Sequence, residues 1–342
     1  MAASTYKCPS CGGYLAFDPE SQKWKCPFCD SIFDEKAVME KEEASHQPAA
    51  EGQQVMYRCQ NCGSEIMTDE TTVATHCYYC HSPVVLEGKL TSDMRPDAVL
   101  PFTVDKEKAV SAFMTWAKSK RYVPKAFFKE AQIESMTGVY YPHFVTDCEA
   151  EGSVEGEGRN ISVSHTPNYV ITKTDHYRVR READLTFHSI IRPALTKANR
   201  KLSDGIHPYP LEEMKPFSDA YLTGFLAERR DIDAERIQPD IEQEIAGYVQ
   251  PLLNDTVHYE SQTLRASSRI KKMKTRYVLL PTWVFTYPNK QNKDDPYYYA
   301  MNGRTGEICG KLPIDRKKLA LTALGFGAVV FAVACVLCYF LF

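Results

Sequence analysis

Residues 8–29 read CPSCGGYLAFDPESQKWKCPFC, and residues 59–80 read CQNCGSEIMTDETTVATHCYYC. Each stretch contains two Cys-x-x-Cys pairs that are separated by 14 residues, and the second stretch follows the first at an offset of 51 residues. Other positions match at the same offset, for example Asp18 with Asp69. We therefore interpret the two stretches as an internal duplication.

The spacing of these cysteines predicts metal binding. Two residues between paired cysteines let one tight turn present both sulfurs to the same ion, and two such turns complete a tetrahedron of four thiolates. Gly12 and Gly63 directly follow a pair, where the chain needs unusual backbone dihedrals. The sequence therefore predicts two zinc ions per chain. The first is held by Cys8, Cys11, Cys26 and Cys29, and the second by Cys59, Cys62, Cys77 and Cys80.

Other chemistries for these cysteines are less favoured. Disulfides are disfavoured because the cytoplasm, where we expect this region, keeps thiols reduced. A thioredoxin-like redox pair would open a helix in a βαβ unit, and the sequence has no such pattern here. His76 and His81 flank the last pair, but four cysteines already complete the coordination, so we interpret both histidines as bystanders. Four protein ligands leave no position for water or substrate, which predicts structural rather than catalytic sites.

The opposite end of the chain is apolar. Residues 319–342 read LALTALGFGAVVFAVACVLCYFLF and contain no charge. A helix of this length rises about 36 Å, enough to cross a hydrocarbon core of about 30 Å. Arg316, Lys317 and Lys318 precede it and favour the cytoplasmic side, and residues 1–10 contain no apolar signal region. We therefore predict a tail-anchored, single-pass protein of the cell membrane with its N-terminal bulk in the cytoplasm.

The charge of the cysteine-rich region argues against nucleic acid. The 342 residues carry a formal charge of −3, and residues 1–90 contain seven basic and thirteen acidic residues. Each four-thiolate zinc site adds a further charge of −2. Binding to a phosphate backbone depends on positive charge and counterion release, so this region would repel it. Tyr14, Trp24, Tyr78 and Tyr79 could stack on bases, but such residues more often close the small core of a ribbon.

These motifs predict the domain organisation. Strands mixed with helices, without a regular βαβ rhythm, favour an α+β fold with an antiparallel sheet. The predicted order is zinc ribbon 1 (1–34), a polar linker (35–55), zinc ribbon 2 (56–89), a central domain of helices and antiparallel sheet (90–313) and one C-terminal transmembrane helix (319–342).

Within the central domain, periodicity predicts a helix that starts at Asp105 and helices over 217–229 and 239–250. Pro142 and Pro281 lie inside predicted strands, and since proline cannot donate a ladder hydrogen bond, we expect edge positions or strand starts. The predicted strands are 138–145, 169–187, 277–287 and 297–301, with a short one near 308.

The central domain shows no catalytic constellation, because P-loop, dinucleotide, HExxH and nucleophile-elbow patterns do not occur. We therefore predict a protein that is not an enzyme and has no small-molecule substrate. Five acidic residues alternate along 147–157, which favours a solvated strand face over a cation site. Residues 265–276 contain six basic residues and no acid. They could contact anionic headgroups or an acidic partner, or form a basic surface of the sheet.

The ordered set of motifs resembles a family of bacterial membrane-anchored proteins with transcription-factor-IIB-type (TFIIB-type) zinc ribbons. The likeness covers nearly the whole chain and rests on both ribbons, on the apolar end and on four motifs between them. These are LPFTV at 100–104, GVYYP at 138–142, LPTWV at 280–284 and AMNGRTG at 300–306. The ribbon motif alone is widespread, so the order of the set carries the resemblance.

The resemblance implies a non-enzymatic membrane adaptor or scaffold that acts in envelope stress. The implied partners are a second membrane protein and soluble proteins that resemble phage-shock protein A (PspA-like) or flotillin (SPFH-like). The alternative is a membrane-tethered zinc-ribbon protein that binds nucleic acid. Local charge separates the two hypotheses and favours the adaptor.

Overall fold

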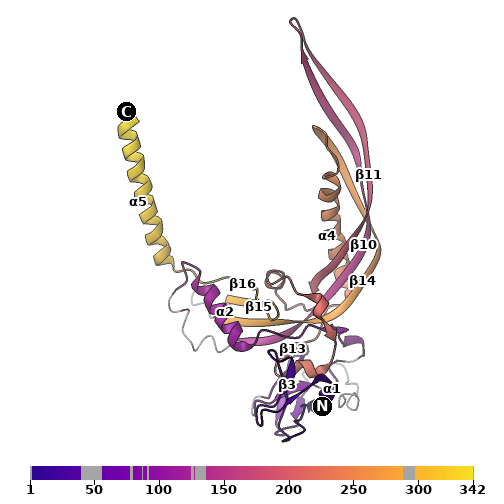
Figure 1. Cartoon of the computed structure of the whole chain (residues 1–342), viewed down its shortest axis with the longest axis vertical. Helices are drawn as coiled ribbons and strands as arrows, with labels where there is room; N and C mark the ends of the chain where they lie inside the picture. The colour runs from indigo at the N-terminus through magenta and orange to yellow at the C-terminus, as the bar shows by residue number, and fades with distance from the viewer. Residues whose placement is uncertain are drawn as a thin grey trace.

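The computed structural model describes residues 2–39, 56–77, 80–86, 88–90, 92–124, 127, 136–287 and 297–341. The described chain is mixed α+β, as predicted. Figure 1 shows the short N-terminal strands gathered at one end of the molecule, while a long β-hairpin and helix α5 project toward the opposite end.

Among the described residues the main sheet contains thirteen strands, and β10 (Thr137–His165) and β14 (Ser261–Tyr287) form its centre. These two strands pair antiparallel, and β10 pairs on its other side with β11 (Val170–Pro193), also antiparallel. Two short strands pair parallel with the central ones: β13 (Leu226–Glu228) with β10, and β9 (Ala98–Val99) with β14. The sheet is therefore mainly antiparallel, as predicted, but mixed.

The other strands have at most six residues, and the longest helices are α2, α4 and α5. The strands are β1 (Ala2–Ser4), β2 (Ala16–Asp18), β3 (Lys23–Lys25), β4 (Ile32–Phe33), β5 (Met56–Cys59), β6 (Glu65–Met67), β7 (Thr72–His76), β8 (Pro83–Leu86), β12 (Lys215–Pro216), β15 (Tyr297–Asn302) and β16 (Ile308–Gly310). The helices are α1 (Glu35–Met39), α2 (Lys106–Lys118), α3 (Arg200–Asp204), α4 (Ala234–Asn254) and α5 (Arg316–Leu341), with 3-10 turns at Ser92–Met94, Leu211–Glu213 and Asp219–Leu222.

Pro142 and Pro281 lie inside the two central strands, which corrects the predicted edge positions. On one side of β10, the pairing with β13 ends at Tyr140 and the pairing with β11 begins at His143. Pro281 falls in the same kind of gap, between the part of β14 that pairs with β9 and the part that pairs with β15. Each proline sits where the neighbouring strand changes, so its missing N–H removes no ladder hydrogen bond there.

Two predicted helices are confirmed. Helix α2 begins where predicted because the Asp105 carboxylate accepts a hydrogen bond from the Lys108 backbone N–H at 2.7 Å. Helix α4 is longer than predicted, and its apolar residues recur every four positions, so they form one stripe that packs on the long strands. The buried stripe consists of Ile237, Ile241, Ile245, Val249 and Leu253.

The helix predicted over 217–229 is wrong. The chain there forms the 3-10 turn Asp219–Leu222 and then strand β13. Gly224 between them has a φ of +92°, which a continuing right-handed helix does not allow. Strand β13 pairs with β10 on one side and β7 on the other, so tertiary pairing decides the conformation.

The acidic and basic segments lie on neighbouring strands of the sheet. Lys271 of β14 lies 3.2 Å from the Glu151 carboxylate of β10, and Arg269 lies 3.0 Å from the same carboxylate. Lys272 lies 3.8 Å from Glu149. The acidic residues therefore form a solvent-exposed strand face, as predicted, and several basic residues of 265–276 neutralise it within the sheet.

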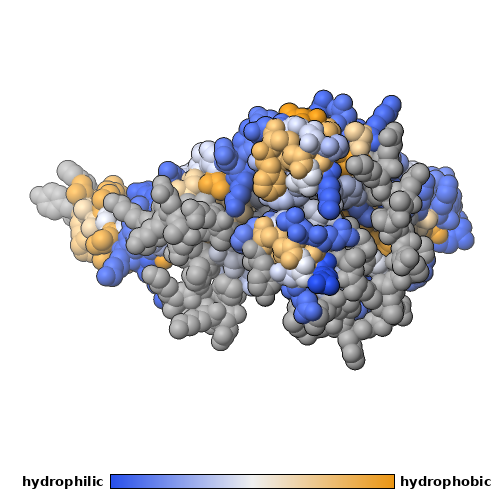
Figure 2. Space-filling view, turned by 90° about the horizontal axis from the view of Figure 1, so that it is seen from below, coloured by the Kyte–Doolittle hydropathy of each residue, from blue (hydrophilic) through white to orange (hydrophobic). Residues whose placement is uncertain are grey.

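Helix α5 is long and apolar enough to cross a membrane, and its span Arg316–Cys338 is not buried by the rest of the structure. Asp315 starts the helix, because its carboxylate accepts hydrogen bonds from the backbone N–H groups of Lys317 and Lys318 at 3.1 Å. In Figure 2, hydrophobic residues colour the projection at the left, on the side where Figure 1 places α5. This agrees with the predicted apolar helix.

Candidate metal centres

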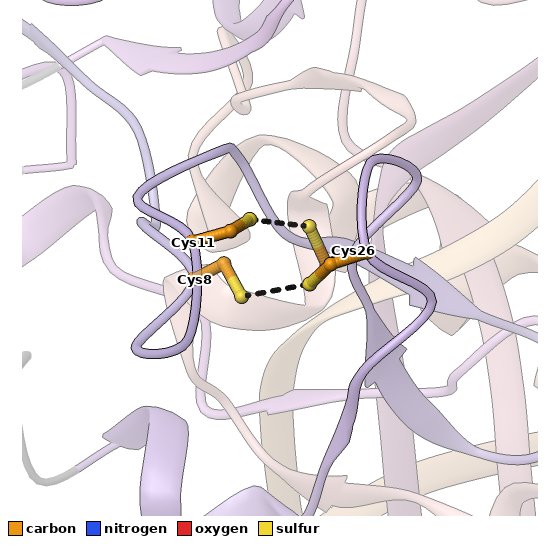
Figure 3. Close-up of side chains that lie close together, drawn as sticks. Cys8, Cys11 and Cys26 are labelled. Carbon is orange, nitrogen blue, oxygen red and sulfur yellow. Dashed lines mark hydrogen bonds between the residues drawn. The ribbon is translucent and has the colours of Figure 1, made fainter.

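The structure brings the eight predicted cysteines together in two groups of four. Within each group, the four Sγ atoms all lie within 4.8 Å of one another. Figure 3 shows Cys8 and Cys11 facing Cys26 across the first centre, from two neighbouring loops. The groups are Cys8, Cys11, Cys26 and Cys29, and Cys59, Cys62, Cys77 and Cys80.

The sulfur–sulfur distances are compatible with zinc. They are 3.6 Å for Cys8 to Cys29, 3.5 Å for Cys11 to Cys26, 3.8 Å for Cys59 to Cys80 and 3.6 Å for Cys62 to Cys77. A regular tetrahedron with zinc–sulfur bonds of about 2.3 Å has edges of about 3.8 Å. A disulfide would need about 2.0 Å. All eight cysteines are free thiols, so the geometry fits a four-thiolate site and not a cross-link.

The same backbone turn holds each Cys-x-x-Cys pair. The N–H of the residue after the second cysteine donates to the carbonyl of the first cysteine, at 2.8 to 2.9 Å in all four turns. That residue has a positive φ each time, at Gly12, Asp30, Gly63 and His81. Sequence reasoning found this position only at the two glycines. His81 is therefore a turn residue outside the ligand sets, in agreement with its predicted role as a bystander.

Neighbouring serines favour the thiolate form of Cys29 and Cys62, each of which is the second cysteine of its Cys-x-x-Cys pair. The Ser31 hydroxyl lies 3.2 Å from Cys29 Sγ, and hydrogen bonds from its side chain and backbone lower the pKa of Cys29 to about 6. Ser64 lowers the pKa of Cys62 in the same way. Burial instead raises the pKa of Cys59 to about 12. Because metal ions bind thiolates, a bound cation would have to hold this buried sulfur deprotonated.

Sequence reasoning missed these serines, although a signal for them exists. A serine follows the second cysteine by two positions in three of the four turns: Ser31, Ser64 and Ser82. An alignment of the four turns with one another would have revealed this serine two positions after the second cysteine, whereas the alignment of the two ribbons did not.

Ribbon 1 docks onto the body mainly through side chains, with one backbone hydrogen bond from the Phe17 N–H to the Thr223 carbonyl at 3.0 Å. Its strands β2, β3 and β4 form a separate three-stranded sheet. Trp24 of β3 is fully buried, and its Nε1–H donates to the Ala220 carbonyl at 2.8 Å. The indole packs against Phe17 of the ribbon and Tyr221 of the body, with ring centroids 5.2 Å apart in both cases. Trp24 is therefore unavailable for stacking on bases. Tyr78 and Tyr79 lie outside the described residues.

Ribbon 2 is continuous with the main sheet. Its strand β7 pairs with β8 inside the ribbon and with β13 of the body. Strand β1, which lies at the start of the predicted range of ribbon 1 but outside its three-stranded sheet, pairs with both β5 and β8 of ribbon 2. The buried Lys89 closes the ribbon, because its ammonium donates to the carbonyls of Asp69 and Glu70 at 2.7 and 2.8 Å.

The predicted polar linker 35–55 begins with helix α1. There the Glu35 carboxylate accepts a hydrogen bond from the Tyr221 hydroxyl at 2.9 Å. The start of the linker is therefore attached to the same part of the body as Trp24 of ribbon 1. Residues 40–55 lie outside the described residues.

One buried histidine lines a cavity of about 330 Å³ beside α3. His143 Nδ1 lies 3.0 Å from the Tyr141 carbonyl and Nε2 lies 2.9 Å from the Ser203 hydroxyl. Burial lowers the pKa of His143 to about 4. Both ring nitrogens have a partner, which is the pattern of a neutral histidine satisfied in the core. None of the predicted site residues lines this cavity.

The protein therefore belongs to a class with two four-cysteine centres, a mixed α+β body and a terminal helix long and apolar enough to span a membrane. The chain is 31% identical over 329 residues to the protein YdjG of Bacillus subtilis (strain 168), a match that covers 96% of this chain and 95% of YdjG. The chain therefore belongs to the YdjG family, a relationship that the sequence motifs also predict. No family model matches the chain, and no solved structure matches it.

Proposed function

We propose that the protein is a zinc-stabilised, non-enzymatic adaptor that helix α5 anchors in the cell membrane and that recruits cytoplasmic proteins. The observation that carries the proposal is that each metal centre is closed. Four cysteines surround each centre, so a bound ion has no open position for water or substrate. The ion would therefore hold turns together, and the surface around it would be available for protein contact.

Zinc is the ion that we assign to both centres. Four thiolates at tetrahedral spacing suit zinc, and iron is the alternative that such ligands also accept. Bound zinc would supply folding stability, since modules as small as these ribbons cannot bury enough apolar surface alone. Eight cysteines in two sets support a content of two ions per chain.

We assign the orientation with the body in the cytoplasm. Arg316, Lys317 and Lys318 form the first turn of α5, at the end that faces the body. Basic residues at one end of a span favour the cytoplasmic side. Free thiols in the centres also suit a reducing compartment.

The outer surface of ribbon 1 is the contact surface that we propose for soluble partners. Phe28 is 66% exposed and Ile32 is 53% exposed, although Phe28 lies between two metal ligands. The Phe28 ring packs edge-on against Tyr14, with centroids 5.1 Å apart, so it is held in this exposed position. The partners implied by the family resemblance are PspA-like or SPFH-like proteins, together with a second membrane protein.

Affinity capture of the full chain from detergent-solubilised membranes, followed by mass spectrometry, tests this proposal. We expect a PspA-like or SPFH-like protein and a second membrane protein with the unaltered chain, and several-fold less of the soluble partner with Phe28→Ser. Tyr298→Ser is the matched control, because Tyr298 is 48% exposed on β15 of the body. Equal capture by both variants would contradict the proposed surface. Loss of all partners after nuclease treatment would favour the nucleic-acid-binding alternative.

A further inference from the structure

The β10–β11 hairpin ends in an apolar tip that no other element covers in the described structure. Strand β14 stops pairing with β10 at Arg159, so the hairpin continues beyond that point as two strands only. We define the hairpin tip as residues 161–171. Its five exposed apolar side chains range from 45% exposed to 73% exposed: Ile161, Val163, Tyr169, Val170 and Ile171.

Four of the five apolar residues of the tip lie on one face or in the turn, and Ile171, which pairs with Ser164, lies on the opposite face. Directly paired residues of an antiparallel hairpin share a face, and alternate residues along a strand return to it. Val170 pairs with His165, two residues beyond Val163, so these side chains lie on the same face as Ile161. Tyr169 closes the turn, where its backbone exchanges hydrogen bonds with Thr166.

On both sides of the tip in sequence, β10 and β11 carry charged side chains. Arg159, Lys173 and Asp175 are the first ionisable residues on the stalk, apart from His165 in the tip. The apolar surface is therefore confined to the end of a long charged hairpin. Exposed apolar side chains that gather at one place and are rimmed by charged residues mark an interaction site.

The position of the tip relative to α5 suggests its partner. Figure 1 shows the hairpin and α5 projecting toward the same end of the molecule, with the metal centres at the other end. If α5 spans a bilayer, the tip is tethered near that bilayer at a high effective concentration. Tyrosine at the end of a polar stalk is also a typical residue of the membrane–water interface.

Backbone chemistry limits how deep the tip can go. Among the described residues, the outer edge of β11 pairs with no strand, and unpaired backbone groups cannot enter hydrocarbon. The charges of Lys173 and Asp175 set the same limit. Only the turn and the adjacent apolar side chains can therefore enter, to the depth of about 5–10 Å that interfacial segments reach.

We propose that the hairpin tip inserts its apolar side chains into the headgroup boundary of the bilayer that α5 anchors. The proposal rests on the membrane anchorage proposed above. Figure 1 places the tip farther along the molecule than the end of α5, so the body must incline relative to α5 on the membrane. The change of inclination would occur at residues 311–315, which form neither helix nor strand, since the span itself is not buried and, in the part of the chain that the structure describes, only the Asp315 N–H bond to the Tyr122 carbonyl has to break or adjust.

Lipid quenching of tryptophan in the full chain tests the proposal. The chain has three native tryptophans, whose emission is subtracted by measuring the unaltered protein in parallel. Tyr169→Trp places an indole in the turn, and the protein is reconstituted in phosphatidylcholine–phosphatidylglycerol vesicles with bromine on shallow acyl carbons. At an interfacial depth of about 5–10 Å the bromines touch the indole, so we expect about half of the added emission to be lost.

Two further variants make the outcomes distinguishable. Glu182→Trp lies thirteen residues along β11 from the turn, about 40 Å away, and its emission should be unaffected by brominated lipid. Leu324→Trp reports the anchor, because Leu324 is an exposed residue of α5, and its emission should be quenched by deeper bromines.

Each result decides a different point. Quenching in Leu324→Trp without quenching in Tyr169→Trp would overturn the tip proposal and leave the anchorage intact. No quenching in Leu324→Trp would overturn the anchorage and the tip proposal together. A shift of the Tyr169→Trp emission that lipid bromine does not quench, and that grows with the protein-to-lipid ratio, would mean contact between copies of the chain and would also overturn the proposal.

Discussion

Ribbon 1 and ribbon 2 each contain the same kind of four-cysteine centre but differ in how they join the rest of the molecule. The cysteine spacing, the backbone turn and the sulfur–sulfur distances of 3.5 to 3.8 Å are common to both. Ribbon 1 forms its own sheet and docks by the side chain of Trp24, whereas strands of ribbon 2 belong to the main sheet. The two repeats therefore have the same local cysteine geometry but different attachments to the body.

The two kinds of attachment predict how far the structural effect of losing a metal ion would extend from each ribbon into the body. Strand β7 pairs with β13, with Ala74 opposite Ala227. Strand β13 pairs in turn with β10 at the centre of the sheet. Damage to ribbon 2 therefore reaches the central strands through backbone hydrogen bonds. Damage to ribbon 1 reaches the body through the contact around Trp24, one backbone hydrogen bond from Phe17 to Thr223 and a few side-chain bonds such as Gln22 to Phe102.

Removal of one ligand from ribbon 2 should have the largest effect. Cys59→Ser should reduce the zinc content from two ions to one and destabilise the fold by about 5 kcal/mol or more, because zinc binding contributes about 10–16 kcal/mol to such modules. Cys8→Ser should lose one ion as well, with a smaller fall in the main thermal transition. Elemental analysis and calorimetry measure both quantities. Equal falls in the two variants would contradict the different attachment of the ribbons.

The next largest effect should follow from undocking ribbon 1. Trp24→Ala removes a fully buried indole and should cost about 3–5 kcal/mol. The zinc content should stay at two ions, because Trp24 is not a ligand. Trp24→Phe keeps most of the packing and loses the bond to Ala220, so about 1 kcal/mol is expected. Denaturant unfolding gives both values, and a loss of zinc in Trp24→Ala would show that docking and metal binding cannot be separated.

A moderate effect is expected from the buried lysine of ribbon 2. Lys89→Met removes the donor for two carbonyls in the β6–β7 turn and should cost about 1–3 kcal/mol. Lys25→Met in ribbon 1 is the control, since Lys25 makes an exposed ion pair with Asp30 and should cost less than about 1 kcal/mol. Similar losses in both variants would remove this contrast between the ribbons.

The smallest effect should appear in the pH dependence of metal release. The pKa of Cys29 is lowered to about 6 before any cation binds, so protons compete less with a bound cation for this sulfur, and its contribution to metal binding weakens only as the pH falls to about 6 and below. Ser31→Ala removes the hydrogen bonds of the hydroxyl, raises this pKa and should move zinc release to higher pH by less than about one unit.

The matched variant in the other ribbon is Ser64→Ala, which acts on Cys62. A chromogenic zinc chelator added during acid titration follows the release in both variants. Shifts of the same size would support equal metal sites in the two ribbons. A shift in one variant only would show that the docking of a ribbon also tunes its thiolates.

Sequence reasoning succeeded where the relevant residues are close in the chain. The ligand pairs are three residues apart, α2 starts at a capping Asp105, and the apolar stretch of α5 is continuous. It failed where a distant partner decides. Residues 217–229 have helical periodicity but form β13, because β7 and β10 offer it hydrogen bonds on both sides.

The sequence by itself determined both four-cysteine groups and the apolar terminal helix, since each depends on side-chain chemistry repeated over a few residues. Only the tertiary structure decided which ribbon joins the sheet, why Pro142 is tolerated at its centre, and that basic residues of β14 neutralise the carboxylates of β10. The physical reason is the distance along the chain between the residues that interact. A metal turn satisfies its hydrogen bonds within six residues, whereas β7 pairs with a strand more than a hundred residues away.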